Sequence, residues 1–205
     1  MTRVLLTGFE PFGGDTTNPS WEAVKRAAEL WDGPETLSIA ELPVEFGRSD
    51  SALLAAIDAT RPDLVVAVGL AGGIPDLHLE RVAINLDDAR IPDNAGDQPI
   101  DLPIAAGGAA AYFTGLPVKA AVRVLTEQGI PASVSHSAGT FVCNHVFYTL
   151  MASGAHGGFV HVPYSPGMAE SKPSLPVETV ARGLVSIVRT ALDTTEDHSI
   201  GGSLF

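Results

Sequence analysis

The run LVVAV (residues 64–68) is continuously apolar and is followed directly by GLAGG (residues 69–73). An unbroken apolar run of this length is typical of a strand that is buried on both faces, as in parallel sheets covered by helices. Similar short apolar runs alternate along the chain with longer segments of helical periodicity. This alternation predicts an α/β protein with a single open, mostly parallel sheet and helices on both faces.

The other elements follow from the same patterns on either side of this strand. We expect strands at 3–7, 36–42, 78–86, 132–136 and 158–162. We expect helices after Asn18, at 49–60, 117–128 and 176–192, and from Thr140 to about Ser153. The segment 87–116 is dense in Asp, Pro, Gly and Ala and is predicted to be irregular. No repeat or linker divides the chain, so 205 residues at about 150 per domain favour a single domain.

Composition excludes several classes of protein. The chain has 24 acidic and 12 basic residues, a formal net charge of −12, which argues against nucleic acid and anionic membranes as partners. The apolar share of 45% argues against disorder, and no apolar run approaches the roughly 18 residues of a membrane span. The start of the chain lacks the apolar core of a signal peptide. With one cysteine, no intrachain disulfide can form, so we expect a cytoplasmic protein.

That cysteine, Cys143, lies in AGTFVCNH (residues 138–145), between a predicted strand and a predicted helix. In the first turn of a helix, free backbone N–H groups and the helix dipole favour thiolate over thiol. Ligands of open α/β sheets bind at the carboxyl ends of strands, where we expect this turn to lie. A free cysteine is also a common small buried hydrophobe. Position alone leaves both interpretations open.

A nucleophilic cysteine needs a base, and His161 is placed to supply it. His161 is near the end of the predicted strand 158–162, at what we expect to be the same edge of the sheet as Cys143. His145 is two residues after Cys143, so on a helix it points away from the thiol and is interpreted as structural or solvent-facing. The remaining candidates are weaker: His136 ends its own strand, and His156 and His198 lie in predicted loop and tail segments.

A third group should orient the imidazole of such a pair. Glu80 lies in the apolar strand segment LHLERVAIN (residues 77–85), where an unpaired buried carboxylate is costly. Its partner is Arg81, Arg90 or His161, and the sequence does not choose between them. Arg90 itself follows two acids in DDARIPDN (residues 87–94), where the simplest interpretation is an arginine that neutralises its local acids.

Templates for other chemistries fail. The chain has no G-x-S-x-G, H-E-x-x-H or C-x-x-C motif. The segment GFEPFGG (residues 8–14) lacks the Lys-Ser/Thr of a P-loop, and GLAGG lacks the G-x-G-x-x-G spacing. We therefore expect neither a metal ion nor a nucleotide cofactor.

Five ordered motifs together resemble the pyroglutamyl peptidases, also called pyrrolidone-carboxylate peptidases, a family of cysteine peptidases. They are LLTGFEPFGG (5–14) with NPSW (18–21), ERVAINL (80–86), ARIPDN (89–94), SAGTFVCN (137–144) and GGFVHVP (157–163). The resemblance implies removal of an N-terminal pyroglutamyl residue from peptides through a thioester acyl-enzyme, in the cytoplasm and without a cofactor. It also implies a phosphorylase/hydrolase-like α/β fold, a homotetramer, and a single catalytic domain over 1–205 with a loose tail at 194–205.

The resemblance also implies roles for individual residues. Cys143 would be the nucleophile, His161 the general base and acid, and Glu80 the residue that orients His161. Arg90 matches in position an arginine placed beside the acyl oxygen. The implied substrate-binding residues are the aromatic walls Phe9, Phe12 and Phe141, the supporting polar residue Asn18, and Val142.

Two positions depart from the family pattern. Leu70 stands where many members have Gln, which removes a possible side-chain hydrogen bond to the ligand. His78 stands where a small hydroxyl residue is usual, two residues before Glu80. These departures bear on fine specificity and on the pH profile, since the three catalytic positions themselves match.

Two alternatives stay open beside the peptidase. The first is a non-catalytic pyroglutamate-binding protein or thiol redox sensor that uses Cys143 as a switch, which predicts reversible oxidation without turnover of any amide. The second is a cysteine amidohydrolase that acts on other small amides, permitted by Leu70. A comparison of pyroglutamyl, prolyl and glutaminyl amides separates the second alternative from the peptidase.

Overall fold

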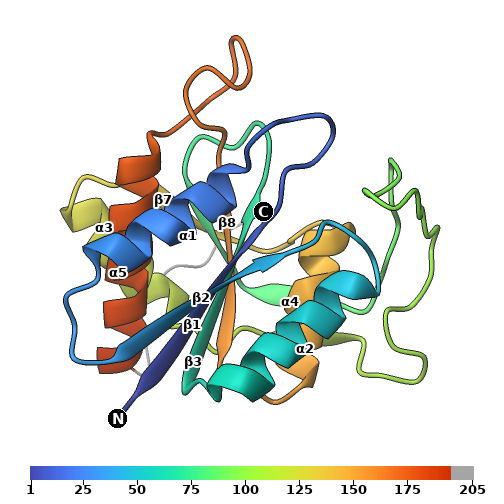
Figure 1. Cartoon of the computed structure of the whole chain (residues 1–205), viewed down its shortest axis with the longest axis horizontal. Coiled ribbons are helices and arrows are strands. Elements are labelled where there is room, and N and C mark those ends of the chain that lie inside the picture. Colours follow the sequence, from blue (N-terminus) through green and yellow to red (C-terminus); the bar gives the residue numbers. More distant parts are fainter. Residues whose placement is uncertain (195–205) are drawn as a thin grey trace, which may run out of the picture.

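The computed structural model describes residues 1–194 and contains a six-stranded sheet in the order β2-β1-β3-β8-β4-β7 (Figure 1). Strand β1 is parallel to β2 and β3, and β3 is parallel to β8. The predicted mostly parallel sheet is therefore confirmed. The strands are β1 (Arg3–Phe9), β2 (Thr36–Leu42), β3 (Leu64–Leu70), β4 (Leu77–Glu80), β7 (Ala132–Ser135) and β8 (Gly157–Val162).

Helices cover both faces of this sheet, as expected from the sequence. Helices α1 (Pro19–Leu30), α3 (Val118–Glu127) and α5 (Val177–Asp193) lie on one face, and α2 (Arg48–Thr60) and α4 (Val142–Ala152) lie on the other (Figure 1). Asn18 begins α1 by accepting the Ser20 N–H at 3.0 Å, with Pro19 at the first helical position.

Two cores follow from this layering, one on each face. In β3, Val66 and Val68 join the core under α1 and α5, whereas Val65 and Ala67 join the core under α2 and α4. Burial on both faces explains why the run 64–68 is continuously apolar rather than alternating.

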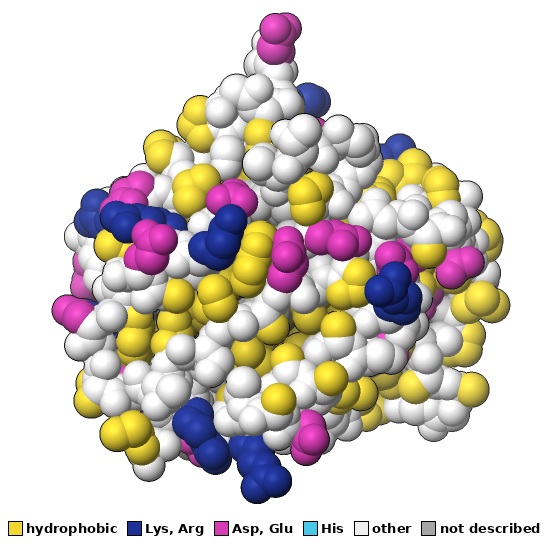
Figure 2. All heavy atoms as spheres, in the orientation of Figure 1, with side chains coloured by type: hydrophobic (Ala, Val, Ile, Leu, Met, Phe, Trp, Pro, Cys, Tyr) yellow, Lys and Arg dark blue, Asp and Glu magenta, His cyan; other side chains and the backbone are white. Residues whose placement is uncertain are grey.

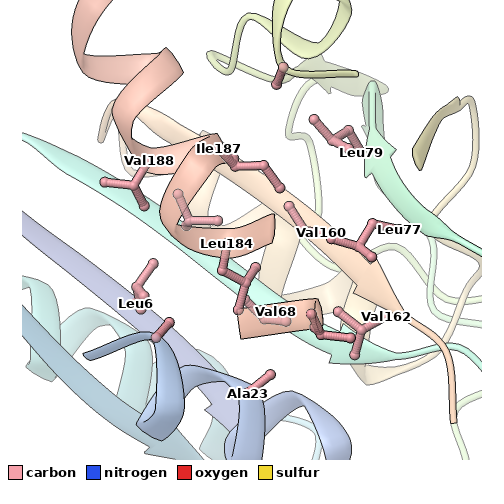
Figure 3. Packing of buried hydrophobic residues seen from close by; sticks show 14 of the residues in the cluster. Leu6, Ala23, Val68, Leu77, Leu79, Val160, Val162, Leu184, Ile187 and Val188 are labelled. Carbon is pink, nitrogen blue, oxygen red and sulfur yellow. The ribbon is translucent and has the colours of Figure 1, made fainter. Parts of the chain in front are cut away.

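The first of these cores is formed by α5 lying across the sheet. Figure 3 shows Leu184, Ile187 and Val188 of α5 over Val68 and Val160 of two neighbouring strands. All five side chains are fully buried.

The predicted strand 78–86 is wrong in one respect, because the chain leaves the main sheet at Arg81. The Arg81 N–H donates to Ser135 O at 2.8 Å, while its carbonyl accepts from Thr114 N at 3.0 Å. Arg81 therefore joins two sheets: β4 ends before it, and β5 (Val82–Ile84) pairs with β6 (Ala111–Phe113) in a separate two-stranded ribbon. Strand β6 lies inside the segment 87–116, which we expected to be irregular throughout.

A second correction concerns strand direction. Strand β4 is antiparallel to β8, and β7 is parallel to β4, so β7 and β8 run in opposite directions. Our expectation that the strand before Cys143 ends at the same edge as His161 is therefore wrong. Residues 136–141 carry the chain back across the sheet, so that Cys143 nevertheless arrives beside His161.

The chain has a net negative charge, and its surface carries both acidic and basic side chains. Figure 2 shows acidic and basic side chains interspersed with small apolar areas on the face seen in Figure 1. Within residues 1–194, no helix is both long and apolar enough to span a membrane. The predicted loose tail lies outside the described residues from position 195 onward.

Candidate active site

Cys143 is the second residue of α4, half-buried, with a free thiol. The residue before the helix, Phe141, has an extended backbone and provides no side-chain cap. Backbone N–H groups in a first helical turn have no intrahelical acceptor, and the helix dipole adds partial positive charge there. Negative charge near the sulfur is therefore stabilised by the helix that carries it.

His161 and Glu80 form a buried pair behind this thiol. His161 lies in β8 and Glu80 in β4. These two strands are antiparallel, and His161 lies opposite His78. This register brings His161 Nδ1 to 2.8 Å from Glu80 Oε1. Glu80 is only 1% exposed, and the ring of Phe159 packs against the imidazole at 4.9 Å between centroids. Of the three partners that the sequence allowed for Glu80, the structure selects His161.

Opposing effects act on the pKa of His161. Burial lowers it, because the imidazolium loses its hydration. The charge and hydrogen bond of Cys143, followed by the hydrogen bond and charge of Glu80, outweigh burial and raise the pKa of His161 to about 9. At neutral pH the imidazole of His161 is therefore protonated and lies between the Cys143 sulfur and the Glu80 carboxyl group, which suits a proton donor beside a nucleophile.

Gly69, at the carboxyl end of β3, makes room for this pair. A Cβ at position 69 would lie 2.8 Å from Cys143 Sγ and 2.8 Å from the Phe159 ring. Gly69 is also the register partner of His161. The absence of a side chain at this position therefore allows the sulfur to pack against the sheet beside its base.

A cavity of about 410 Å³ opens beside Cys143. Its aromatic walls include Phe12 and Phe141, whose ring centroids are 5.4 Å apart. The ring of Phe46 meets Phe141 edge-on at 5.3 Å and supports it from behind. These rings pack against each other and form one continuous apolar wall, against which a flat, mainly apolar group can lie with its edge toward the thiol.

The structure brings most of the predicted site residues to this cavity. Its lining includes Cys143 and the predicted residues Phe9, Phe12, Asn18, Arg90, Phe141 and Val142. Glu80 and His161 are not part of the lining and lie behind the thiol.

Asn18 lines the cavity, but its amide is already engaged. Its Nδ2 donates to Glu10 O at 2.8 Å, and its Oδ1 accepts from the Ser20 N–H and hydroxyl at 3.0 and 2.9 Å. Asn18 therefore supports the wall by shaping the loop before α1.

Arg90 is exposed at the cavity. Within residues 1–194 it forms no ion pair, so the simpler interpretation of an arginine that neutralises its local acids is not supported.

Sequence analysis missed several lining residues. Val44, Ile91 and Tyr164 also face the cavity, and a Cβ at Gly72 would overlap the Tyr164 hydroxyl. Ile91 adjoins a residue that we had singled out, whereas Val44 and Tyr164 follow strands without any motif to mark them. Leu70, noted as a departure, is part of the lining.

His145 and His78 are engaged elsewhere, and His198 lies outside the described residues. His145 is structural: its Nδ1 lies 2.8 Å from Asp87 Oδ2 and its Nε2 is 3.8 Å from Asp50. Burial lowers the pKa of His145, but the two carboxylates outweigh this effect and raise it above its ordinary value. His78 Nε2 pairs with Asp76 at 2.9 Å.

The comparison with known families decides the assignment. The model of the family described as pyroglutamyl peptidase matches residues 2–194. The chain belongs to the pyroglutamyl peptidase family. Family membership gives it the function of a cysteine peptidase that removes an N-terminal pyroglutamyl residue.

Known pyroglutamyl peptidases resemble the chain over its full length. The pyrrolidone-carboxylate peptidase of Clavibacter michiganensis subsp. michiganensis is 52% identical over 212 residues and covers 100% of each chain. Pyroglutamyl peptidase I from Bacillus amyloliquefaciens has a solved structure with a TM-score of 0.93 and 47% identity, covering 98% of this chain and 99% of that one. The solved structure of the pyrrolidone carboxyl peptidase from Thermococcus litoralis has a TM-score of 0.87 and 36% sequence identity, and the match covers 94% of each chain.

Within residues 1–194, no group of three or more His, Cys, Asp and Glu side chains is arranged to hold a metal ion.

Proposed function

We propose that Cys143, His161 and Glu80 carry the peptidase reaction of this chain, as nucleophile, proton carrier and orienting carboxylate. The observation that supports these roles best is the line from Glu80 through His161 to Cys143, with its 2.8 Å carboxylate–imidazole contact. The cavity beside Cys143 is the corresponding pyroglutamyl site. In this proposal, residues 1–205 form one catalytic domain.

The reaction begins when the thiolate of Cys143 attacks the carbonyl carbon of the pyroglutamyl residue. The resulting tetrahedral intermediate collapses, the C–N bond to the next residue breaks, and the imidazolium of His161 protonates the departing amine. A thioester remains on Cys143. Neutral His161 then takes a proton from water, whose oxygen attacks the thioester and releases free pyroglutamate and the thiolate.

Two donors are available for the oxyanion. The N–H of Cys143 belongs to the first turn of α4, and the guanidinium of Arg90 lies at the same cavity. Loss of one such donor typically costs about 100- to 1000-fold in rate. We therefore assign Arg90 to stabilisation of the transition state.

The pocket also explains selection of the blocked N-terminus. The pyrrolidone ring has two flat apolar faces, which suit Phe9, Phe12 and Phe141, and one amide edge for backbone hydrogen bonds. Val142 and Asn18 complete this part of the wall. A free, charged α-amino group is rejected because its burial among these rings is unfavourable.

We infer further that the chain acts as a homotetramer in the cytoplasm on peptides with an N-terminal pyroglutamyl residue. Family resemblance supports the tetramer, as do the exposed apolar side chains Ile100, Leu102 and Phe113, the last of them 73% exposed. A reducing compartment keeps the single cysteine available as a thiolate.

The test is release of a chromogenic amine from its pyroglutamyl amide, with and without iodoacetamide. We expect turnover that is abolished by alkylation, and by Cys143→Ser with the circular dichroism spectrum unchanged. Substantial residual activity of the serine variant would contradict the assignment. Prolyl and glutaminyl amides serve as controls: their turnover would favour a broader amidohydrolase, and reversible thiol oxidation without turnover would favour a sensor.

A further inference from the structure

Three separate loops form much of the wall of the cavity. Phe9 ends β1 and Phe12 belongs to the loop between β1 and α1. Val44 belongs to the loop between β2 and α2, and Arg90 and Ile91 to the segment after β5. The distances between these loops decide how closely the walls enclose a ligand. Three polar residues that do not line the cavity, Glu10, Asp93 and Asn94, connect them, and we call these residues the wall network.

Glu10 is the first residue of the first loop and lies between Phe9 and Phe12 in the sequence. Its Oε1 accepts a hydrogen bond from the Val44 N–H at 3.1 Å and another from Asn94 Nδ2 at 2.9 Å. Its own N–H donates to Leu42 O at 2.9 Å. One carboxylate oxygen therefore joins all three loops.

Asn94 closes the same connection from the third loop. Its backbone N–H donates to Val44 O at 3.0 Å. Its side-chain Nδ2 donates to Pro11 O at 3.0 Å in addition to Glu10. The segment that carries Arg90 and Ile91 is therefore bound to both other loops only a few residues after those side chains.

Asp93 fixes the shape of this third loop. Its Oδ1 accepts from the N–H groups of Ala95 and Asp97, both at 2.9 Å, and its Oδ2 accepts from the Phe46 N–H at 2.7 Å. Asp93 as a whole residue is only 6% exposed. Because Phe46 supports the ring of Phe141, this contact extends the network to the aromatic wall directly before α4.

We propose that Glu10, Asp93 and Asn94 are positioning residues that set the spacing of the pocket walls and thereby the affinity for the pyroglutamyl ring. This inference rests on the assignment of the cavity as the pyroglutamyl site. Within residues 1–194, the hydrogen bonds of these three side chains given above do not reach Cys143, His161 or Glu80, so the network acts on binding and leaves the Cys143–His161 pair unchanged. Walls that hold the ring equally in the ground state and the transition state affect KM rather than kcat.

The test compares Asn94→Ala, Glu10→Ala and Glu10→Gln with the wild-type chain. We expect KM for a chromogenic pyroglutamyl amide to rise about 10- to 100-fold in both alanine variants, the size expected for lost hydrogen bonds to a charged group, with kcat nearly unchanged. Glu10→Gln should restore most of the affinity, because its amide oxygen accepts the same two bonds. Glu41→Ala is the matched control, since Glu41 is exposed and makes no side-chain hydrogen bond within residues 1–194.

The rate of Cys143 alkylation by iodoacetamide is the second readout, because this small reagent does not need the pocket walls. We expect the rate to be unchanged in all variants. A fall in kcat at constant KM, a slower alkylation, or a Glu10→Gln variant as impaired as Glu10→Ala would overturn the inference. If Glu10→Ala does not fold, Asn94→Ala decides, since Asn94 is exposed. Absence of wild-type turnover would instead refute the proposed function.

Discussion

Replacement of Glu80 by glutamine is expected to move the alkaline limb of the pH–rate profile to lower pH. Catalysis as proposed needs His161 protonated, so kcat/KM falls as the imidazolium loses its proton. In the wild-type chain that loss occurs at about pH 9, because Cys143 and Glu80 together outweigh the effect of burial. Glutamine is nearly isosteric, and its oxygen still accepts from Nδ1–H, so the ring stays oriented while the negative charge is removed.

The size of the shift follows from the contact that is changed. The pKa of His161 rises from 6.5 to about 9 through several contributions, of which the Glu80 contact at 2.8 Å is one. A hydrogen bond to a charged group contributes about 1.5–3 kcal/mol and a neutral one about 0.5–1.5 kcal/mol, so an amide that keeps the bond removes about 1–1.5 kcal/mol. At about 1.36 kcal/mol per pKa unit, this corresponds to roughly 1 unit. The alkaline limb is therefore expected at about pH 8 in Glu80→Gln.

The assay is kcat/KM for a chromogenic pyroglutamyl amide measured across the pH range, with thermal unfolding followed at each pH. Glu41→Gln, which changes an exposed carboxylate in β2, is the control and should leave the profile in place. An alkaline limb that stays at its wild-type position in a folded Glu80→Gln variant would refute the reasoning. It would mean that the thiolate alone holds the proton on His161.

Three further predictions follow from individual contacts. Gly69→Ala places a methyl group 2.8 Å from Cys143 Sγ, and a displaced sulfur is expected to lower kcat by about 100-fold, measured with the same amide. His145→Gln removes a group whose pKa is lowered by burial but raised overall by Asp87. The stability from this pair is complete below the unfolded pKa of about 6.5 and is lost as pH rises through the higher folded value, so urea unfolding should show the largest wild-type advantage at acidic pH and a smaller one at alkaline pH. Leu70→Gln adds a hydrogen-bonding group to the cavity lining and should lower KM about 2- to 10-fold, the effect of one added hydrogen bond; an unchanged KM would show that position 70 does not contact the ring.

The central sheet could be predicted because its evidence is local. Burial on both faces leaves a mark within the five residues 64–68 themselves, and turn residues bound the neighbouring strands. Strand direction has no such mark, since a β-strand has the same side-chain period whichever way it runs. The antiparallel pairing of Leu79 with Val160 is decided by contacts between residues 81 positions apart, and so the reversal at β4 and β7 was missed.

The same distinction separates the parts of the site. A helix start at Cys143 and a strand end at His161 are local properties, and the sequence analysis found both. The partner of Glu80 depends on which strand lies beside β4, so three candidates stayed open until the structure placed His161 at 2.8 Å. The role of Gly69 depends on a sulfur 74 positions away along the chain, and within the apolar run and its glycines nothing distinguishes it from Gly72 or Gly73.

The two residues that follow Cys143, Asn144 and His145, connect α4 to the segment after β5. Asn144 accepts from Ile84 N at 3.1 Å and donates to Ile84 O and Leu86 O at 2.9 and 3.0 Å, and His145 pairs with the carboxylate of Asp87. Helix α4 is thereby bound to the segment that leads directly to Arg90. Because these polar groups are buried, their loss would leave unsatisfied partners at a cost of about 1–3 kcal/mol each. The thiol and the guanidinium are therefore held in relation to each other by side chains that take no part in the reaction.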